Sequence, residues 1–355
     1  MTFEELGYHS ELEEFRASKQ LEGFEIGRII SEHKDRYVLK TPTSDLEAEL
    51  VGTMRFAAED RYDLPAVGDW VAFSPYDEDK ALIHAIYPRT TILERQVAGK
   101  KSQIQIIATN IDFGLIVQAA DRDFNLNRLE RYLTICNTAR VEPIVVLSKI
   151  DLLDTVDLEN ILHQIQARVK DIQVITVSNQ LANGYEALKD VFEEGKTYCL
   201  LGSSGVGKST LLNHILGEKR METSHISDSV NKGRHTTSHR ELFLLPQGGV
   251  LIDNPGMREV GLTNVASGLE TTFESILAYA DSCRFSDCTH MHEKGCAILD
   301  ALDAGEIDEA AYANFQKMEK EKLHFESSAQ QRKKKDKDLG KLIKNYKKQR
   351  KSDKY

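Results

Sequence analysis

The chain has 355 residues, of which 41% are hydrophobic and 29% charged, and it carries a formal net charge of -10. This composition indicates two or three globular domains and argues against a surface that coats nucleic acid throughout. No apolar run approaches the ~20 residues that span a bilayer, and the N-terminus lacks a basic segment followed by an apolar one. We therefore expect a cytoplasmic protein without a membrane partner.

The first 95 residues predict an N-terminal arm and a small β-barrel. Residues 1–21 are polar and charged, as in a short helix or a loose arm. Strand-like stretches separated by proline and glycine follow at 47–50, continued at 53–56, and at 69–73 and 81–86. Several short strands in about 70 residues indicate a closed, OB-like barrel. Trp70 is either a core residue or a platform for a nucleic-acid base, and we favour the core.

From about residue 96 to residue 265, apolar strands alternate with helices. The expected strands are 113–117, 143–147, 174–177, 197–201 and 250–252, and the expected helices include 126–138 and 158–169. This pattern predicts an α/β domain with a parallel sheet and ligand loops at its strand ends. Residues 220–240 are polar without an apolar period, and we expect a switch loop there.

A phosphate loop is the most specific motif of this central domain. The run Gly202-Ser203-Ser204-Gly205-Val206-Gly207-Lys208-Ser209 matches G-x4-G-K-[ST] between a predicted strand and an amphipathic helix. Glycines let backbone N–H groups converge on phosphate oxygens. Lys208 would neutralise the β- and γ-phosphates, and Ser209 would hold Mg²⁺. We add Thr210, the next residue, to the predicted nucleotide contacts.

A second phosphate-side element, Asp253-Asn254-Pro255-Gly256, follows the strand 250–252. Asp253 is placed to hold Mg²⁺ directly or through water, as a Walker-B acid does. The Gly256 N–H could sense the γ-phosphate. A D-x-P-G run alone usually marks a turn, but downstream of a phosphate loop it indicates a nucleotide site.

Two further features bear on hydrolysis. Thr236 and Thr237 lie in the polar switch region, and either can close over Mg²⁺ and the γ-phosphate. Met257 stands where many small GTPases carry a water-orienting glutamine. A methionine can neither orient nor deprotonate water, so intrinsic hydrolysis should be slow unless His235 or a partner supplies that function.

The candidate guanine-reading element is Ser148-Lys149-Ile150-Asp151, directly after the strand 143–147. A carboxylate at Asp151 can accept hydrogen bonds from guanine N1–H and the 2-amino group, which adenine lacks, and the Lys149 stem can stack on the base. These residues argue against an ATPase or a kinase. The alternative is a helix N-cap followed by a lysine. The element precedes the phosphate loop, whereas in ordinary small GTPases it follows, so we interpret the domain as circularly permuted.

Three of the five cysteines lie in the compact run Cys283-x4-Cys288-x-His290-x5-Cys296. Clustered cysteines in a reducing compartment are more often metal ligands than disulfides. Three thiolates and one imidazole would complete the tetrahedral shell of one structural Zn²⁺. His292 is the alternative imidazole, and a zinc-free group of buried thiols is the alternative to a metal.

Residues 266–328 predict a mainly helical zinc-binding domain, followed by a basic tail at 329–355. Within it, residues 307–322 predict a helix whose apolar stripe, Ala311, Phe315 and Met318, we interpret as a packing face. The tail carries 12 Lys/Arg and 3 Asp between residues 332 and 354. A basic tail on an acidic body suits contact with a polyanion, and a solvated tail without a partner is the alternative.

Together these motifs resemble the circularly permuted, ribosome-dependent GTPases of the RsgA/YjeQ family, from about residue 23 to residue 325. The resemblance implies an OB domain, a permuted GTPase domain and a zinc domain. It also implies GTP hydrolysis to GDP and phosphate, stimulated by the small (30S) ribosomal subunit during late maturation, and contact with its rRNA. We expect a monomer. A nucleotide-gated RNA-binding module with negligible hydrolysis is the alternative function.

Three positions depart from the usual GTPase pattern. Ser148 replaces the Asn of Asn-Lys-x-Asp, a change that can lower the affinity for the nucleotide. Asn254 replaces the usual Thr between Asp and Pro. The Ser-Ala element appears as Ser178-Asn179, which should be tolerated because the element acts largely through backbone N–H groups.

Overall fold

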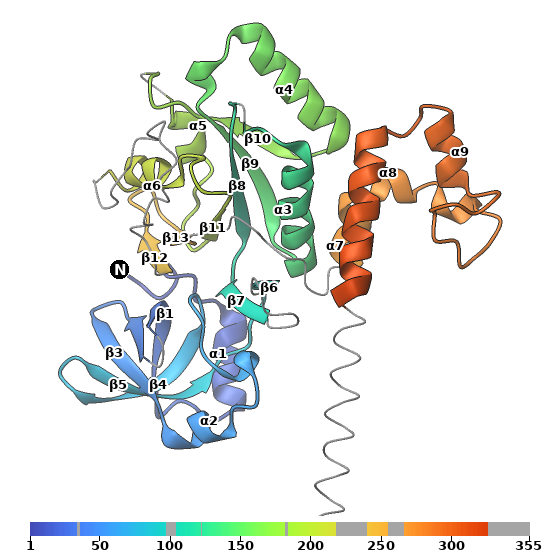
Figure 1. Ribbon diagram of the computed structural model, residues 1–355. Helices are drawn as coiled ribbons and strands as arrows, with labels where there is room; N and C mark the ends of the chain where they lie inside the picture. The colour runs from blue at the N-terminus through green and yellow to red at the C-terminus, as the bar shows by residue number, and fades with distance from the viewer. Residues whose placement is uncertain are drawn as a thin grey trace, which may run out of the picture.

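The computed structural model describes residues 1–33, 36–96, 104–121, 123–181, 184–217, 240–254 and 266–325. Three parts succeed one another along the chain: a barrel, a central α/β domain and a group of helices beside that domain (Figure 1). No helix in the described ranges has the length and apolar character needed to cross a bilayer.

The N-terminal part is a closed five-strand barrel preceded by α1 (Ser10–Ser18). Its strands are β1 (Glu25–His33), β2 (Arg36–Lys40), β3 (Asp45–Leu50), β4 (Trp70–Asp77) and β5 (Lys80–Ile86). They pair in the order β1-β2-β3-β5-β4, and β4 returns to β1. Only β3 and β5 pair in parallel within this ring. The arrangement confirms the predicted OB-like barrel, in which closure removes the sheet edges.

The predicted strand continuation at Thr53–Phe56 is wrong, because these residues lie in helix α2 (Gly52–Ala57). The side chain of Phe56 is 94% exposed, so the alternation in this segment does not separate a buried from an exposed face. The structure confirms the core interpretation of Trp70, which is 1% exposed and packs edge-on against Tyr8 at a ring distance of 5.0 Å.

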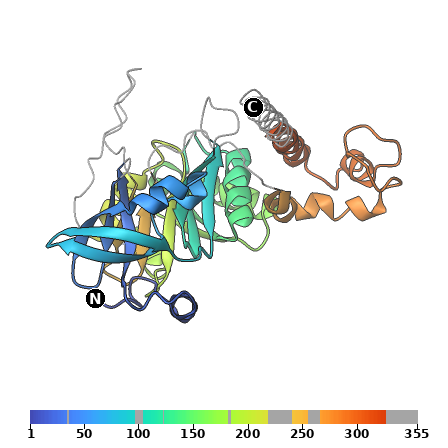
Figure 2. The same ribbon diagram turned by 90° about the horizontal axis from the view of Figure 1, so that it is seen from below.

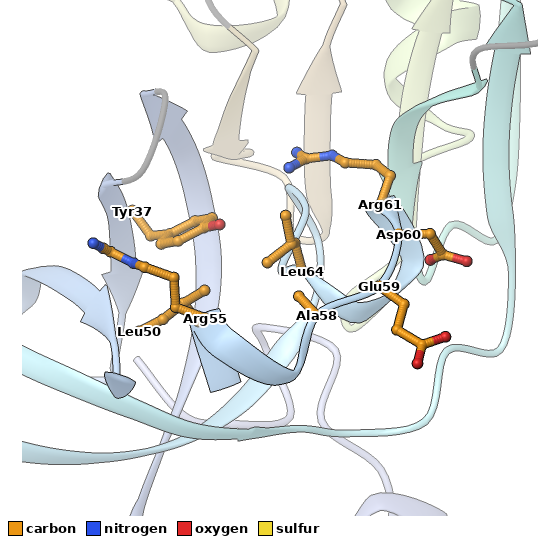
Figure 3. Close-up of a pocket in the computed structure, with 8 residues that line it drawn as sticks. All are labelled: Tyr37, Leu50, Arg55, Ala58, Glu59, Asp60, Arg61 and Leu64. Carbon is orange, nitrogen blue, oxygen red and sulfur yellow. The ribbon is translucent and has the colours of Figure 1, made fainter. Parts of the chain in front are cut away.

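A pocket of about 350 Å³ lies between α2, the following 3-10 turn and strands β2 and β3 (Figure 3). Arg55 and Arg61 line it together with Glu59 and Asp60. Arg61 also pairs with Glu32. Two basic and two acidic side chains thus line this pocket.

The central domain is built on a sheet that contains all five predicted strands. They are β8 (Phe113–Ala119), β9 (Glu142–Ser148), β10 (Gln173–Thr176), β11 (Thr197–Leu201) and β13 (Val250–Asp253). These strands are parallel, in the order β10-β9-β8-β11-β13, and β12 (Glu241–Leu244) adds antiparallel to β13. Their near-continuous burial is typical of a parallel sheet covered on both faces.

The helices of this domain are α3 (Leu126–Ala139), α4 (Thr155–Arg168), α5 (Glu186–Lys189) and α6 (Lys208–Leu216). Side-chain oxygens of Asn125 and Asp154 cap the N-termini of α3 and α4, which accounts for their starting points. The prediction of helices at 126–138 and 158–169 is confirmed, although α4 begins three residues earlier than expected.

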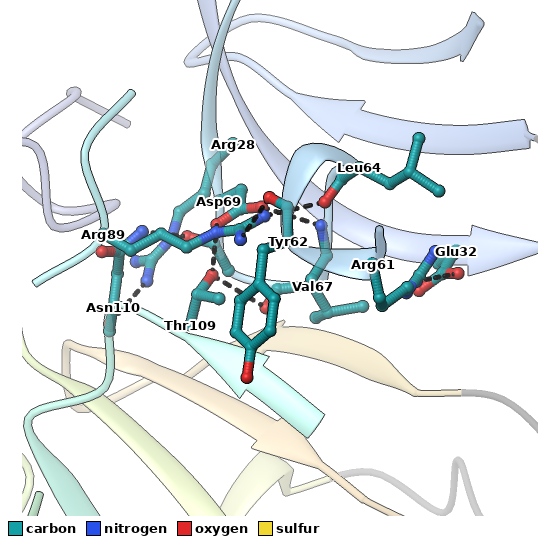
Figure 4. Close-up of polar contacts among 12 residues, drawn as sticks. Arg28, Glu32, Arg61, Tyr62, Leu64, Val67, Asp69, Arg89, Thr109 and Asn110 are labelled. Atoms are coloured by element: carbon teal, nitrogen blue, oxygen red, sulfur yellow. Dashed lines mark hydrogen bonds and ion pairs between the residues drawn. The ribbon is translucent and has the colours of Figure 1, made fainter. Parts of the chain in front are cut away.

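The barrel and the central sheet are joined directly. Strand β1 pairs with β12 through Ser31 and Glu241, and the hairpin β6 (Ile92–Gln96) and β7 (Ile104–Thr109) connects the two parts. Beside this junction, the buried side chain of Arg28 donates hydrogen bonds to four groups from separate parts of the chain, and Figure 4 shows Arg28 beside one of them, Asn110. They are the carbonyl oxygens of Leu6, Gly68 and Asn110 and the hydroxyl of Thr197.

A buried ion pair completes the junction. Arg89 donates to both carboxylate oxygens of Asp69 at 2.8 and 2.6 Å, and the Thr109 hydroxyl donates to Asp69 at 2.6 Å (Figure 4). Burial lowers the pKa of Arg28 to about 10, so its guanidinium remains charged at neutral pH. These bonds fix the barrel against the sheet that carries the phosphate loop.

The C-terminal part comprises α7 (Ala266–Thr272), α8 (Glu274–Leu277), α9 (Ala297–Asp303) and a helix at 309–325. Seen from below, these helices project from the side of the central domain that carries α3 (Figure 2). Helix α7 crosses α3 closely at Gly268, where an added Cβ would lie 2.1 Å from the hydroxyl of Thr138. The packing role predicted for the stripe Ala311, Phe315 and Met318 is confirmed, because all three side chains are buried.

Candidate nucleotide site and metal centre

The phosphate loop connects β11 to α6, as the motif requires. Gly202, Gly205 and Gly207 adopt φ values of 146°, 86° and 98°, which residues with a side chain rarely adopt. Gly207 forms the N-cap of α6, so the free N–H groups of the first helical turn face the loop. The amphipathic character predicted for this helix is confirmed, because one set of apolar residues is buried: Leu211, Leu212, Ile215 and Leu216.

Lys208 and Asp253 supply the charges beside this loop. The Lys208 Nζ donates to the carbonyl oxygens of Gly202 and Ser203, both at 2.7 Å. Burial lowers the pKa of Lys208 to about 8, and Asp253 opposes the change. Asp253 ends β13 and is 5% exposed, and burial raises its pKa while Lys208 opposes that increase. A partly buried cation at the start of α6 and a buried carboxylate at the end of β13 form a site able to hold a phosphate and a divalent metal.

The predicted guanine-reading loop lies against the phosphate loop. The Ser148 hydroxyl is 2.6 Å from the carbonyl oxygen of Val206 and 3.2 Å from that of Gln118. Ser148 is 6% exposed, so its hydrogen bond to Val206 joins the two loops at a buried position. The serine that replaces the usual asparagine therefore makes a direct contact with the phosphate loop.

Asp151 and Ser178 meet at the ends of neighbouring strands β9 and β10. The Ser178 hydroxyl donates to Asp151 Oδ1 at 2.5 Å and accepts from the Gln180 N–H at 3.0 Å. Asn179 accepts a hydrogen bond from the Tyr185 hydroxyl, and the Tyr185 ring stacks on His214 of α6. The structure thus brings together the two segments that the sequence predicts to read the base, while Asp151 itself stays exposed.

Two side chains that sequence reasoning missed also lie in this site. Asp121 accepts from the Lys149 Nζ at 2.9 Å, and Arg128 donates to the Ser203 hydroxyl at 3.1 Å. Asp121 follows the carboxyl end of β8, a position at which ligand-binding residues collect in parallel sheets, and this signal is present in the sequence. Nothing local in the sequence indicates that Arg128 reaches a residue 75 positions later.

Several predicted residues lie outside the described ranges. They are His235, Thr236 and Thr237 of the switch region, Gly256 and Met257 after Asp253, and the basic tail from residue 329. Asn254 is described: it is 1% exposed, and its side-chain oxygen accepts from the Arg240 Nε at 3.3 Å.

The four predicted metal ligands converge. The ligand atoms of Cys283, Cys288, His290 and Cys296 all lie within 4.8 Å of one another, whereas the alternative imidazole, His292, is not part of this group. The Cys283 and Cys296 sulfurs are 3.9 Å apart, and each lies 3.6 or 3.5 Å from His290 Nδ1. A tetrahedral zinc ion requires about 3.8 Å between two sulfurs and about 3.5 Å between sulfur and nitrogen.

The environment of Cys283 also suits a thiolate. Burial acts to raise the pKa of Cys283. Hydrogen bonds from backbone N–H groups at the start of α9 and from the Cys296 thiol nevertheless lower this pKa overall. A coordinating cysteine must lose its proton, so this shift favours metal binding. Distances and donor types therefore fit a structural zinc ion.

Comparison with known proteins identifies the family. A family model described as RsgA GTPase matches residues 86–263. The small ribosomal subunit biogenesis GTPase RsgA of Opitutus terrae is 40% identical over 313 residues, which cover 85% of this chain and 85% of that protein. The chain belongs to the RsgA GTPase family. The RsgA protein of Methanosarcina acetivorans is similarly close, with 41% identity over 323 residues that cover 90% of this chain and 85% of that protein.

Solved structures agree with this membership. YjeQ from Thermotoga maritima has 26% identity and a TM-score of 0.61, and the match covers 84% of this chain and 98% of that one. The circularly permuted GTPase YloQ shares the fold with a TM-score of 0.59 at 23% identity, covering 84% and 96% of the two chains. A model described as ABC transporter also matches residues 185–348, which include the phosphate loop found in ATPases and GTPases alike. The chain is thus a circularly permuted P-loop GTPase of the RsgA family.

Proposed function

We propose that this RsgA-family protein hydrolyses GTP in a cycle that times its binding to, and release from, the small ribosomal subunit during late maturation. The observation that carries the proposal is the contact between Ser148 and Val206, which unites base-reading and phosphate loops that stand in permuted order along the chain. The name of the Opitutus terrae and Methanosarcina acetivorans relatives, small ribosomal subunit biogenesis GTPase, supplies the partner.

The residues of the site have distinct proposed roles. Asp151 and Lys149 select guanine, with Ser148, Ile150, Ser178 and Asn179 shaping the pocket around the base. The phosphate loop from Gly202 to Thr210 binds the phosphates through its N–H groups. Lys208 neutralises the negative charge that the phosphate oxygens gain in the transition state. From the sequence alone, we assign γ-phosphate contacts to Thr236 or Thr237 and to Gly256, and water activation to His235 or to a partner.

Two metals complete the proposal. Ser209 and Asp253 would hold Mg²⁺, which neutralises phosphate charge. Cys283, Cys288, His290 and Cys296 would hold one structural Zn²⁺, which leaves no coordination position open for chemistry.

We propose domain boundaries at 1–95, 96–265 and 266–328, followed by a basic tail at 329–355. Along the chain, the barrel precedes the GTPase domain and the zinc domain and the tail follow it, and we propose that these parts contact rRNA from two directions. The protein would act as a monomer in the cytoplasm. Counterion release from rRNA phosphates should make this binding weaken as salt is raised.

Co-sedimentation with purified ribosomal subunits tests the proposal. The protein should bind small subunits more tightly with a non-hydrolysable GTP analogue than with GDP, because the γ-phosphate orders switch loops in GTPases. Large subunits are the matched control and should bind equally weakly in both states. Equal binding of small subunits in the two nucleotide states would contradict the timing role.

Measurement of GTP turnover separates the alternative function. Met257 is the observation that favours a nucleotide-gated RNA-binding module, since it cannot orient water. Under that alternative, the chain would bind small subunits with nucleotide dependence and yet show no GTP turnover above that of a Lys208→Ala variant.

A further inference from the structure

The metal-binding loop folds around one carboxylate. Glu293 Oε1 accepts a hydrogen bond from the Thr289 N–H at 3.0 Å and another from the Thr289 hydroxyl. Its Oε2 accepts from the N–H groups of Met291 and His292 at 3.0 and 3.2 Å. A single side chain therefore satisfies three backbone donors within four residues.

These donors lie next to two of the proposed metal ligands, Cys288 and His290. Thr289 follows Cys288 directly and precedes His290, and Met291 comes next, so Glu293 ties down the backbone on both sides of the imidazole. His290 itself has a φ of 57°, a left-handed conformation that is uncommon for a residue with a side chain. Such conformations persist where surrounding contacts over-determine them.

A second hydrogen bond holds the backbone of His290, through its carbonyl oxygen. The Tyr312 hydroxyl, on the helix at 309–325, donates to the carbonyl oxygen of His290 at 2.5 Å. Gln316, one turn further along that helix, donates to the Tyr312 hydroxyl at 2.5 Å. The backbone of His290 is thus held by groups that are not themselves metal ligands.

We propose that Glu293 is a positioning residue of the metal centre, which shapes the loop so that Cys288 and His290 face the ion together. Glu293 is not among the four side chains whose ligand atoms converge, and its oxygens are occupied by backbone donors. It acts through the backbone of the ligands. A preformed loop loses less conformational freedom when the ion binds, and this raises metal affinity.

Competition for zinc between the full-length protein and a chelator tests this role. Glu293→Ala should weaken zinc affinity by about 10- to 100-fold, the usual loss when a group that orients metal ligands is removed. Glu293→Gln keeps one acceptor oxygen and the side-chain shape, so it should lose less. Asp287→Ala removes an exposed carboxylate immediately before Cys288 and should leave zinc affinity unchanged.

Two additional readouts distinguish positioning from general stability. Each variant should bind GDP like the parent, because the nucleotide site lies on other elements. With Co²⁺ in place of zinc, the parent should show a tetrahedral absorption spectrum, and Glu293→Ala should require more Co²⁺ to reach it.

The inference rests on the proposed zinc site, and the outcomes separate the two. A parent protein that binds no zinc would refute the zinc site and with it the role of Glu293. Unchanged zinc affinity in Glu293→Ala, with a zinc-binding parent, would overturn the positioning role alone. Parallel loss of zinc and GDP binding would also overturn it, because the side chain would then stabilise the whole protein.

Discussion

Replacing Arg168 by alanine should detach the C-terminal helix at 309–325 from the central domain. Arg168 donates to both carboxylate oxygens of Glu130 at 2.9 and 2.8 Å, and to Asp308 at 3.2 Å. Asn314, on that helix, donates to the same carboxylate at 2.6 Å. The substitution leaves Glu130 with a buried charge, since its side chain is 3% exposed.

The expected loss of folding free energy in Arg168→Ala is large. Removing one partner of a buried ion pair destabilises a protein by about 3–5 kcal/mol. If this cost appears as local opening of the helix, amide hydrogen exchange at residues 309–325 should accelerate by roughly 100- to 4,000-fold, since 1.4 kcal/mol is tenfold. Hydrogen exchange followed by mass spectrometry measures this directly.

The Arg131–Glu321 pair provides the control. It joins α3 to the helix at 309–325 at 2.7 Å, but its side chains are 21% and 30% exposed. Exposed ion pairs contribute about 0–1 kcal/mol, so loss of this pair in Arg131→Ala should accelerate exchange by no more than about fivefold. Equal acceleration in the two variants would show that burial does not set the cost of losing the pair.

The destabilisation caused by Arg168→Ala should also depend on pH. Burial raises the pKa of Glu130, and the Arg168 guanidinium opposes that increase. Without Arg168, the folded protein should hold the Glu130 proton to higher pH than the unfolded chain does. Stability from this group is then present at low pH and lost as pH rises, so Arg168→Ala should cost more at pH 8 than at pH 5.

Four shorter predictions concern the nucleotide and metal sites. Asp151→Asn should shift preference from GTP toward XTP, because the amide can donate to a 2-oxo group, and competition binding that shows unchanged GTP affinity would contradict this. Lys208→Ala should abolish GTP turnover without altering thermal unfolding. Because the Lys208 pKa is about 8, GTP affinity of the nucleotide-free parent, measured by titration, should fall above that pH by up to about tenfold per unit. Cys288→Ser should reduce zinc from one per chain toward none while GDP affinity stays constant, which elemental analysis and GDP titration would check.

The structure brings the predicted base-reading and phosphate segments together, and the sequence can predict this because the relevant residues lie in short segments. Glycine at 202, 205 and 207 marks a backbone that requires positive φ, and continuous apolar runs identify the neighbouring strands. The spacing of three cysteines and a histidine likewise predicts a cluster that the structure confirms. Parallel strands then gather these segments at one edge of the sheet.

The errors and omissions have separate physical causes. Periodicity reports burial only if one face of a segment is covered, and in α2 the exposed Phe56 imitates a strand pattern without any such face. Contacts between distant residues leave no local trace. Arg28 joins Thr197 across 169 positions, and Arg168 joins Glu130 across 38. Glu293 lies only four residues from Thr289, but its role depends on a loop shape that spacing does not encode.

Stimulation of GTP hydrolysis by the small ribosomal subunit is the property on which the proposed function depends most. Steady-state phosphate release should be measured for the protein alone, with purified small subunits and with large subunits, each beside the Lys208→Ala variant. We expect slow turnover by the protein alone and a marked increase with small subunits only. An unchanged rate on adding small subunits, or equal stimulation by large subunits, would contradict the proposed function.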